Sequence, residues 1–495
     1  MSAPAFTGLL RWELRQVGRS RLLWLVLGVL VLAMVWGARG GADLHRQQDA
    51  AIERARHGDA AWMDQVRERA RRYAEPAAGE LPYWQDPTDI AGFSRYFLRT
   101  QAYKPHLPLS PLAVGASDLL PARLPVKLET AFGVEPVYDF ENPRGLALGR
   151  FDLGFVLVYL LPIACILLVG LLATFERDTG MLRLIAAQRV GPRAWLGARI
   201  AAIALWLAPV ALLGLCVALA LAGTDLSDAL PELLAAMGLV LAYLGFWLAL
   251  GFAVVACWPS AAAAISSLVA LWALLAIGLP LAGNAAVSAF APAPSAVTVV
   301  DEQRRANDAI AAQRDAIVTA AFRRRADLSV AIERVAGIDY ATRLSFLAPE
   351  LERRLQPLHL RQTQARDRRE RASDLIGYLA PPLGLQSALA TLAGTDLARH
   401  RRFEEQARAY QLRLRAWFYP RIQREIAAPT PRVLTGSYGR MNFRDYDAIP
   451  AWSDSHAPVS ARIATVAPLA LWLSLLAAAL TAWALSRLRH WPTEL

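Results

Sequence analysis

"LLAAMGLVLAYLGFWLALGFAVVACWPSAAAAISSLVALWALLAIGLPLAG" spans residues 233–283 and contains two apolar runs joined only by "CWPS". A helix needs roughly 20 apolar residues to cross the hydrocarbon core of a bilayer, and each run is long enough. Pro259 cannot continue the first helix, so the chain must turn there. The short joint then makes the two helices an antiparallel hairpin inside a membrane.

Four more apolar runs lie outside this hairpin, and none of the six runs has a charge in its interior. We therefore predict an all-α membrane protein with six transmembrane helices at 22–38, 152–174, 200–222, 233–257, 261–283 and 463–486. A signal peptide is the alternative for the first run, since small residues follow Trp36. No clean Ala-x-Ala cleavage site follows, and five further spans argue against it.

Short loops predict the orientation. Arginines cluster before span one, between spans two and three, and after span six, whereas the loop between spans three and four carries Asp225 and Asp228 and no Lys or Arg. The positive-inside rule then places both termini (1–21 and 487–495) and segment 175–199 in the cytoplasm. The long segments 39–151 and 284–462 would be extracytoplasmic, because long loops translocate regardless of charge. The net charge of +11 fits anchoring on anionic lipid better than binding of nucleic acid.

The two long segments predict one mainly helical lobe. Stretches 39–75, 300–378 and 395–426 have the composition of long helices, which could continue spans one and five beyond the bilayer. Pro-rich "LPYWQDPTD", "YKPHLPLSPL" and "APAPS" indicate connectors. Aromatic residues in "RYFLRTQAY" and "RAWFYPRI" favour a lobe core over a docking surface. Together the segments are long enough to bury such a core without disulfides.

One charged segment between spans two and three, "FERDTGMLRLIAAQRVGPRAW" (175–195), predicts a short helix at the membrane surface. Asp178 or Thr179 can cap it, and Gly180 lets the chain turn away from span two. The apolar face of this helix consists of Met181, Leu182, Leu184 and Ile185. Two interpretations remain open: the helix rests on lipid, or it inserts into a groove of another protein.

This segment resembles the coupling segment of ABC type-2 transporter permeases, although the "Q-P-V"-like element here reads Gln188-Arg189-Val190, with the proline at Pro192. The N-terminal "LLRWELRQVGRSRLLWL" resembles the amphipathic elbow helix of the same family. There we expect Trp12, Leu14 and Val17 in the membrane interface. By resemblance, the ATPase-coupling residues would be Glu176, Arg177, Asp178, Gly180, Met181, Leu182, Leu184, Ile185, Gln188 and Arg189, and those of the elbow helix Trp12, Glu13, Arg15 and Arg19.

The long segments resemble a branch of this family with two large extracytoplasmic inserts and a domain of unknown function, near the multicopper-enzyme-maturation permeases. Stretches 110–127, 142–162 and 381–422 carry this likeness. The resemblance implies a multi-pass protein of the bacterial inner membrane and a second permease chain, either identical or a paralogue. It also implies a separate cytoplasmic ABC ATPase, which would bind ATP and Mg²⁺, and allows a periplasmic partner for the inserts.

The sequence gives no sign of an enzyme. A P-loop needs a Gly-rich run ending in Lys-Ser or Lys-Thr, and the only lysines, Lys104 and Lys127, lack that context. The seven histidines show no metal-ligand spacing, so we interpret them as solvated loop residues and expect no metal and no cofactor of the chain's own. Cys165, Cys216 and Cys257 lie in three different spans, where we expect small buried apolar groups.

Two functions therefore remain. The chain is the permease subunit of an ATP-driven exporter, or it is a docking or mechanotransmission protein that supports periplasmic enzyme maturation and transports nothing. The absence of an ionisable residue inside the spans counts against proton-coupled transport. Tyr159, Pro162, Tyr243 and Gly245 are the main polar or helix-softening residues within the spans, and packing is favoured over lining a path. No motif in the sequence identifies the substrate.

Overall fold

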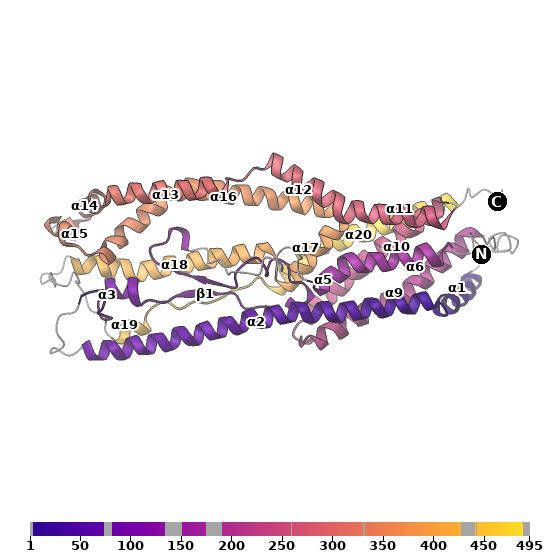
Figure 1. Cartoon of the computed structure of the whole chain (residues 1–495), viewed down its shortest axis with the longest axis horizontal. Helices are drawn as coiled ribbons and strands as arrows, with labels where there is room; N and C mark the ends of the chain where they lie inside the picture. Colours follow the sequence, from indigo (N-terminus) through magenta and orange to yellow (C-terminus); the bar gives the residue numbers. More distant parts are fainter. Residues whose placement is uncertain are drawn as a thin grey trace.

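Long apolar helices form one end of the elongated molecule and a lobe forms the other (Figure 1). The computed structural model describes residues 3–73, 82–133, 151–174, 191–258, 260–329, 332–426, 441 and 443–488. Six helices in this part of the chain are long and apolar enough to span a membrane, which confirms an all-α membrane protein. They are α2 (Arg21–Tyr73), α5–η4–α6 (Leu153–Phe155, Val156–Leu160, Leu161–Leu172), α9 (Pro192–Leu221), α10 (Leu230–Cys257), α11–η5–α12 (Ala261–Ala273, Leu274–Gly278, Leu279–Phe290) and α20 (Val459–Arg487).

The ends of these helices follow the local sequence. Gly191 precedes α9, which begins at Pro192 as the sequence indicates, because proline fits the first turn of a helix. Helix α10 ends at Cys257, and Ser260 caps α11 by accepting a hydrogen bond from the Ala263 amide at 3.3 Å. The predicted antiparallel hairpin thus has its turn between residues 257 and 261.

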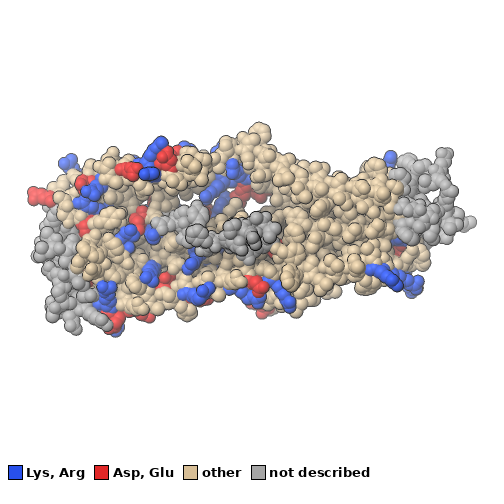
Figure 2. Space-filling view, viewed as in Figure 1, with Lys and Arg blue, Asp and Glu red and all other residues tan. Residues whose placement is uncertain are grey.

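Helix α10 is the most buried of the six and packs against α20, α6 and α9. Its Tyr243 and Trp247 are fully buried, and the Tyr243 hydroxyl donates a 2.7 Å hydrogen bond to the Val158 carbonyl. Tyr243 therefore packs within the bundle, as favoured from the sequence. Figure 2 shows the same division on the surface: charged side chains are scattered over the lobe, whereas the visible face of the bundle is bare of them over most of its length.

Helix α2 links the bundle to the lobe without a break. Its 53 residues extend for roughly 80 Å at 1.5 Å per residue. Gly37 and Gly40 let the chain at 151–153 lie directly on this helix, since a Cβ on Gly37 would be 2.6 Å from the Asp152 carbonyl oxygen and one on Gly40 would be 2.8 Å from that of Phe151. The small residues after Trp36 thus have a packing role.

The lobe is mainly helical, with a small antiparallel sheet in which Gln101 pairs with Pro125 and Tyr103 with Arg123. The helical elements within residues 82–133 are short. The "APAPS" stretch is a connector between α12 and α13. Besides the outer part of α2, the lobe contains α3 (Ile90–Gly92), η1 (Phe93–Phe97), β1 (Gln101–Tyr103), η2 (Ser110–Leu112), β2 (Arg123–Pro125), η3 (Ala131–Gly133), α13 (Ala296–Ala312), α14 (Arg314–Arg324), α15 (Ala326–Ser329), η6 (Ile332–Gly337), α16 (Tyr340–Leu379), α17 (Pro381–Ala393), α18 (Leu397–Ile426) and α19 (Phe443–Asp447).

Apolar packing holds the lobe together. Phe97 and Phe418, from the two aromatic stretches noted in the sequence, lie in one core with Phe93 and the far end of α2. A second core joins α14 and α15 to α16 and includes Phe322 and Phe346. The aromatic residues thus contribute to the lobe core as predicted, although Tyr96 is exposed.

The base of the lobe shares its core with the membrane bundle. Leu109, which precedes η2, and Leu112 of η2 belong to the same buried cluster as the bundle helices, together with Leu385 and Leu389 from α17. This continuous packing attaches the base of the lobe firmly to the membrane helices.

Farther out, α16 and α18 are joined by ion pairs. Glu352 of α16 contacts Arg408 and Arg415 of α18, each at 2.5 Å, and Arg401 of α18 contacts Asp367 at 2.8 Å and Glu370 at 2.5 Å. Burial raises the pKa of Glu352, but hydrogen bonds and charge attraction from Arg415 and Arg408 outweigh it and leave the pKa below its ordinary value.

Candidate functional site

Helix α1 (Ala3–Gly18), the end of α6 and the start of α9 meet at the end of the bundle farthest from the lobe (Figure 1). The predicted coupling segment connects the last two of these helices. Its core, 175–190, lies outside the described residues, so the structure does not place Glu176, Arg177, Asp178, Gly180, Met181, Leu182, Leu184, Ile185, Gln188 or Arg189. Both points from which this segment emerges are described.

A buried ion pair ties these points together. Arg199 of α9 is 3% exposed and Glu13 of α1 is 0% exposed, and the Arg199 Nε donates to Glu13 Oε2. A second guanidinium nitrogen of Arg199 donates to the Leu172 carbonyl, the last residue of α6, at 2.5 Å. One side chain thus links α1, α6 and α9. Removing either partner from such a pair leaves an uncompensated buried charge, which is strongly destabilising.

The elbow helix packs into the bundle more deeply than expected. Trp12, Arg15 and Arg19 are exposed, in keeping with a surface helix. The expectation that Val17 lies in the membrane interface is wrong: Val17 is 2% exposed and belongs to the bundle core. Leu14 packs against that core, and its carbonyl accepts a hydrogen bond from Trp206 Nε1 at 3.2 Å. Because α1 contributes apolar side chains to the core, it is part of the bundle.

A second buried ion pair lies at the lobe side of the bundle. Arg462 of α20 contacts Glu232 of α10 at 2.5 Å, and both residues are at most 7% exposed. Arg462 also donates to the Leu392 carbonyl of α17 at 3.4 Å. Glu232 and Arg462 each lie next to a predicted span, so a buried arginine–glutamate pair lies near each end of the bundle.

Three histidines contradict their interpretation as solvated loop residues. His45 and His400 are 3% and 4% exposed, and the His106 side chain is 4% exposed. The rings of His45 and His106 stack with centroids 4.2 Å apart, and His106 Nδ1 lies 2.8 Å from Asp49 Oδ1. Among the residues that the structure describes, neither ring nitrogen of His45 has a hydrogen-bond partner. These residues lie far apart in the sequence, and the base of the lobe brings them together.

A buried lysine lies beside the third histidine. Lys104 Nζ is 3.1 Å from His400 Nδ1, and His400 Nε2 is 3.5 Å from Glu404 Oε1. Burial, together with the charge of Arg399, lowers the pKa of Lys104 to about 8. A charged Lys104 can only donate, so His400 Nδ1 is the acceptor in this contact, and His400 Nε2 is the ring nitrogen that faces Glu404.

The described residues contain no cluster of three or more His, Cys, Asp or Glu side chains arranged to hold a metal ion. The three cysteines are unpaired: Cys165 is buried, Cys216 is half-buried and Cys257 is exposed. The expectation of a buried residue is therefore right for Cys165 and wrong for Cys257, which ends α10.

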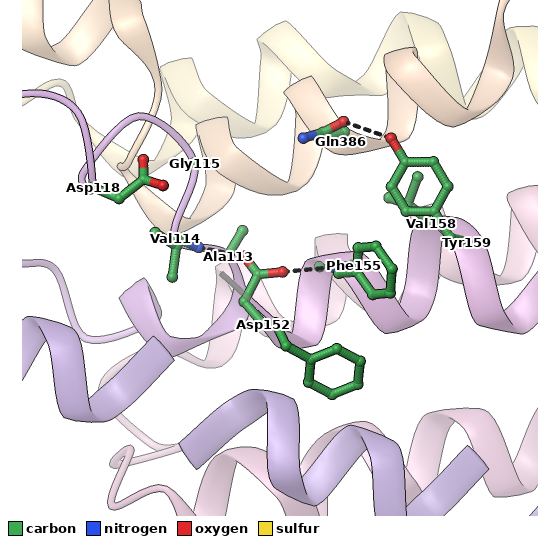
Figure 3. A pocket seen from close by; sticks show the side chains of 11 residues that line it. Ala113, Val114, Gly115, Asp118, Asp152, Phe155, Val158, Tyr159 and Gln386 are labelled. Atoms are coloured by element: carbon green, nitrogen blue, oxygen red, sulfur yellow. Dashed lines mark hydrogen bonds between the residues drawn. The ribbon is translucent and has the colours of Figure 1, made fainter. Parts of the chain in front are cut away.

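A pocket of about 580 Å³ opens where the lobe meets the second span (Figure 3). Tyr159 lines it, unlike the fully buried Tyr243, and donates a 3.3 Å hydrogen bond to Gln386. The lining residues are Ala113, Val114, Gly115, Asp118, Phe151, Asp152, Gly154, Phe155, Val158, Tyr159 and Gln386.

Sequence reasoning missed the pairing of Glu13 with Arg199, although one signal was present. Glu13 is the only acidic residue before Asp43, and it lies among Arg11, Arg15 and Arg19. A lone carboxylate in a basic amphipathic helix indicates a specific partner. Its partner, 186 residues away, could not be chosen from the arginines of segment 175–199 without the fold.

Comparison with known proteins gives one match. Residues 296–430 are similar to a family model described as "Domain of unknown function (DUF3526)". The matched stretch runs from α13 to the end of α18, so it covers one side of the lobe and none of the six membrane helices. No curated protein and no solved structure matches the chain.

Proposed function

We propose that this protein is the permease subunit of an ATP-driven exporter and that segment 175–190 docks on a separate ABC ATPase. The observation that carries this proposal is the Glu13–Arg199 pair with its bond to the Leu172 carbonyl. It ties α6 and α9, the helices on either side of the segment, to each other and to α1. A force applied to the segment would therefore move three helices together.

The proposal also gives the bundle an orientation. Segment 175–190 and α1 would face the cytoplasm of a bacterium and the lobe would lie outside the inner membrane, in agreement with the arginines of the short loops. The ATPase would bind ATP and Mg²⁺, and a second permease chain would complete the transporter.

Helix α2 favours a second candidate, mechanotransmission without transport. It runs unbroken from the bundle into the far core of the lobe, where Val66 and Ala70 are buried. A rigid helix of this length would carry a tilt at the membrane directly to the lobe. The ion pairs between α16 and α18 would make these two helices of the outer lobe move together when α2 tilts.

The coupling proposal is tested by replacing Leu184 and Ile185 together with Asp and purifying the tagged chain from its native membranes. Loss of a copurifying ABC ATPase, with unchanged membrane insertion, is the expected result, because two charges would disrupt an apolar docking face. Leu119→Asp is the control, since Leu119 is 68% exposed on the lobe. Equal recovery of the ATPase with both variants would refute the proposal.

A further inference from the structure

The corner between α16 and α17 reaches down from the lobe into the membrane bundle. At the corner, Trp472 Nε1 of α20 donates a hydrogen bond to the Tyr378 carbonyl at 2.9 Å. Near the other end of α17, the Leu392 carbonyl accepts one from Arg462, which is also on α20. Because α20 advances 1.5 Å per residue, the corner lies about 15 Å deeper in the bundle than Arg462.

The sequence of this corner suits the interior of a membrane. The stretch from Leu375 to Thr395, "LIGYLAPPLGLQSALATLAGT", carries no charge. Helix α17 has 13 residues, too few to span a bilayer, and an apolar helix of this length is typical of a buried or re-entrant segment. Its Leu385 and Leu389 belong to the bundle core, so its backbone is sheltered by protein. The corner therefore has the features of a re-entrant hairpin.

One face of α16 is exposed beside this corner and changes character along its length. Leu379, Leu375, Arg371 and Arg368 are spaced three or four residues apart, so they share one face of the helix. Leu375 and Leu379 are 69% and 68% exposed, and both arginines are exposed as well. The face is thus apolar at the corner and basic farther toward the lobe.

The exposed leucines continue the outer surface of two membrane helices. Helix α16 contacts α12 closely, since a Cβ on Gly283 would be 2.7 Å from Ile376 Cδ1, and it contacts α20 through Trp472. The helices α11–η5–α12 and α20 are the two least buried of the six candidate spans. Leu375 and Leu379 therefore extend an apolar surface that already faces lipid.

Arg368 and Arg371 bond only to their own helix in the part of the chain that the structure describes. Each Nε donates to a carbonyl one turn earlier at 3.2 Å, and neither arginine forms an ion pair with a described residue. The neighbouring acids Asp367 and Glu370 contact Arg401 of α18 instead. Both guanidinium groups are thus left for an anionic ligand.

The two arginines lie near the edge of the apolar belt. From Tyr378 back to Arg371 and Arg368, α16 covers about 10–15 Å, nearly the distance that separates the corner from Arg462 on α20. Both helices run along the long axis of the molecule (Figure 1), and Arg462 lies next to the end of the sixth span. Asp374 is an exposed acid beside this face, and it forms no ion pair with Arg371.

We propose that this face binds an anionic phospholipid of the leaflet nearest the lobe, with its phosphate on Arg368 and Arg371 and one acyl chain against Leu375 and Leu379. Guanidinium groups match the oxygens of a phosphate. The leucines continue a lipid-facing surface, and a soluble anion would leave them uncovered. The inference concerns binding and does not depend on coupling to an ATPase.

The first test counts bound lipids by native mass spectrometry of the full chain, released from nanodiscs of phosphatidylglycerol and phosphatidylcholine. Wild type is expected to retain phosphatidylglycerol. Arg368→Gln with Arg371→Gln should retain one such lipid fewer, because loss of both guanidinium contacts lowers the affinity of the site about tenfold. An unchanged number of retained phosphatidylglycerol molecules in this double variant would contradict the proposal.

The matched control is Arg323→Gln with Arg324→Gln. These two arginines are exposed at the end of α14, at the tip of the lobe far from the bundle (Figure 1). The control variant loses the same charge and should retain as much phosphatidylglycerol as wild type. Equal losses in both double variants would show that net charge alone sets the retention, and would overturn the site.

A spin label at residue 379 tests the occupant of this face. Leu379→Cys is labelled in a chain whose Cys165, Cys216 and Cys257 are replaced by Ala. In liposomes, oxygen should reach this label and an aqueous nickel chelate should not, whereas a label at Arg368→Cys should show the reverse. A label at 379 that the chelate reaches would place the corner outside the bilayer. A disulfide between two unlabelled Leu379→Cys chains would place a second copy on this face. Either result would overturn the proposal.

Discussion

Arg199 of α9 lies buried against Glu13 of α1, 186 residues earlier in the chain, and also holds the carbonyl of Leu172 at the end of α6. This arrangement makes the N-terminal helix a structural part of the bundle. It also explains why α1 carries a single acid, Glu13, among its arginines.

The Glu13–Arg199 pair provides a direct test of the bundle. Glu13→Ala leaves the Arg199 charge buried and should lower the free energy of unfolding by about 3–5 kcal/mol. Thermal unfolding in detergent micelles measures this effect. The double variant Glu13→Gln with Arg199→Gln removes both charges and should recover part of the loss. A single variant as stable as wild type would show that the pair does not hold the three helices.

Gly37 should tolerate no side chain. The Cβ of Gly37→Ala would be 2.6 Å from the Asp152 carbonyl oxygen, so the chain at 151–153 must shift, at a cost of about 1–3 kcal/mol. Gly28→Ala is the matched control on α2, because a Cβ there meets nothing within 4 Å. The expected order of melting temperatures is Gly28→Ala at or above wild type and Gly37→Ala below it. Equal melting temperatures for the two variants would contradict the close contact.

His45 should be replaceable by an apolar ring. Both of its nitrogens are buried and have no hydrogen-bond partner in the described part of the chain. His45→Phe therefore removes a desolvation cost while keeping a ring stacked on His106, and should stabilise the protein by about 1–3 kcal/mol. His106→Phe is the comparison and should destabilise, since it breaks the bond to Asp49. Differential scanning fluorimetry of both variants gives the sign of each change in stability. Destabilisation by His45→Phe would show that a nitrogen of His45 has a hydrogen-bond partner, and would contradict this prediction.

Lys104 should make stability depend on alkaline pH. Burial lowers its pKa in the folded protein to about 8, whereas an unfolded lysine titrates near about 10.4. Between these values the unfolded chain binds more protons, so this group makes stability rise as pH increases from 8. Lys104→Met lacks this contribution. The melting temperature of wild type relative to Lys104→Met should therefore increase between pH 8 and pH 10, and a constant difference would contradict the lowered pKa.

The sequence predicts the membrane helices well because apolar length is a local property. The hairpin at 233–283, the start of α9 at Pro192 and the continuation of α2 beyond span one could all be read from neighbouring residues. The helical stretch expected at 300–378 is broken instead into α13, α14, α15, η6 and α16.

Contacts between distant segments could not be predicted in this way. The stacking of His45 on His106 and the pairing of Glu232 with Arg462 arise where the lobe folds back on the bundle. The local sequence pattern around each of these residues does not identify its partner. The pocket could not be predicted for the same reason, because its walls come from residues 113–118, 151–159 and 386.

The central claim, that segment 175–190 docks on an ATPase, is tested most directly by site-specific photocrosslinking in native membranes. A photoreactive amino acid at Leu184 should give a covalent adduct with a single ABC ATPase, identified by mass spectrometry, whereas the same group at Ser227, in the loop joining α9 to α10, should give none. If the Leu184 probe reacts with lipid alone, the segment is an interfacial helix and the coupling account is wrong.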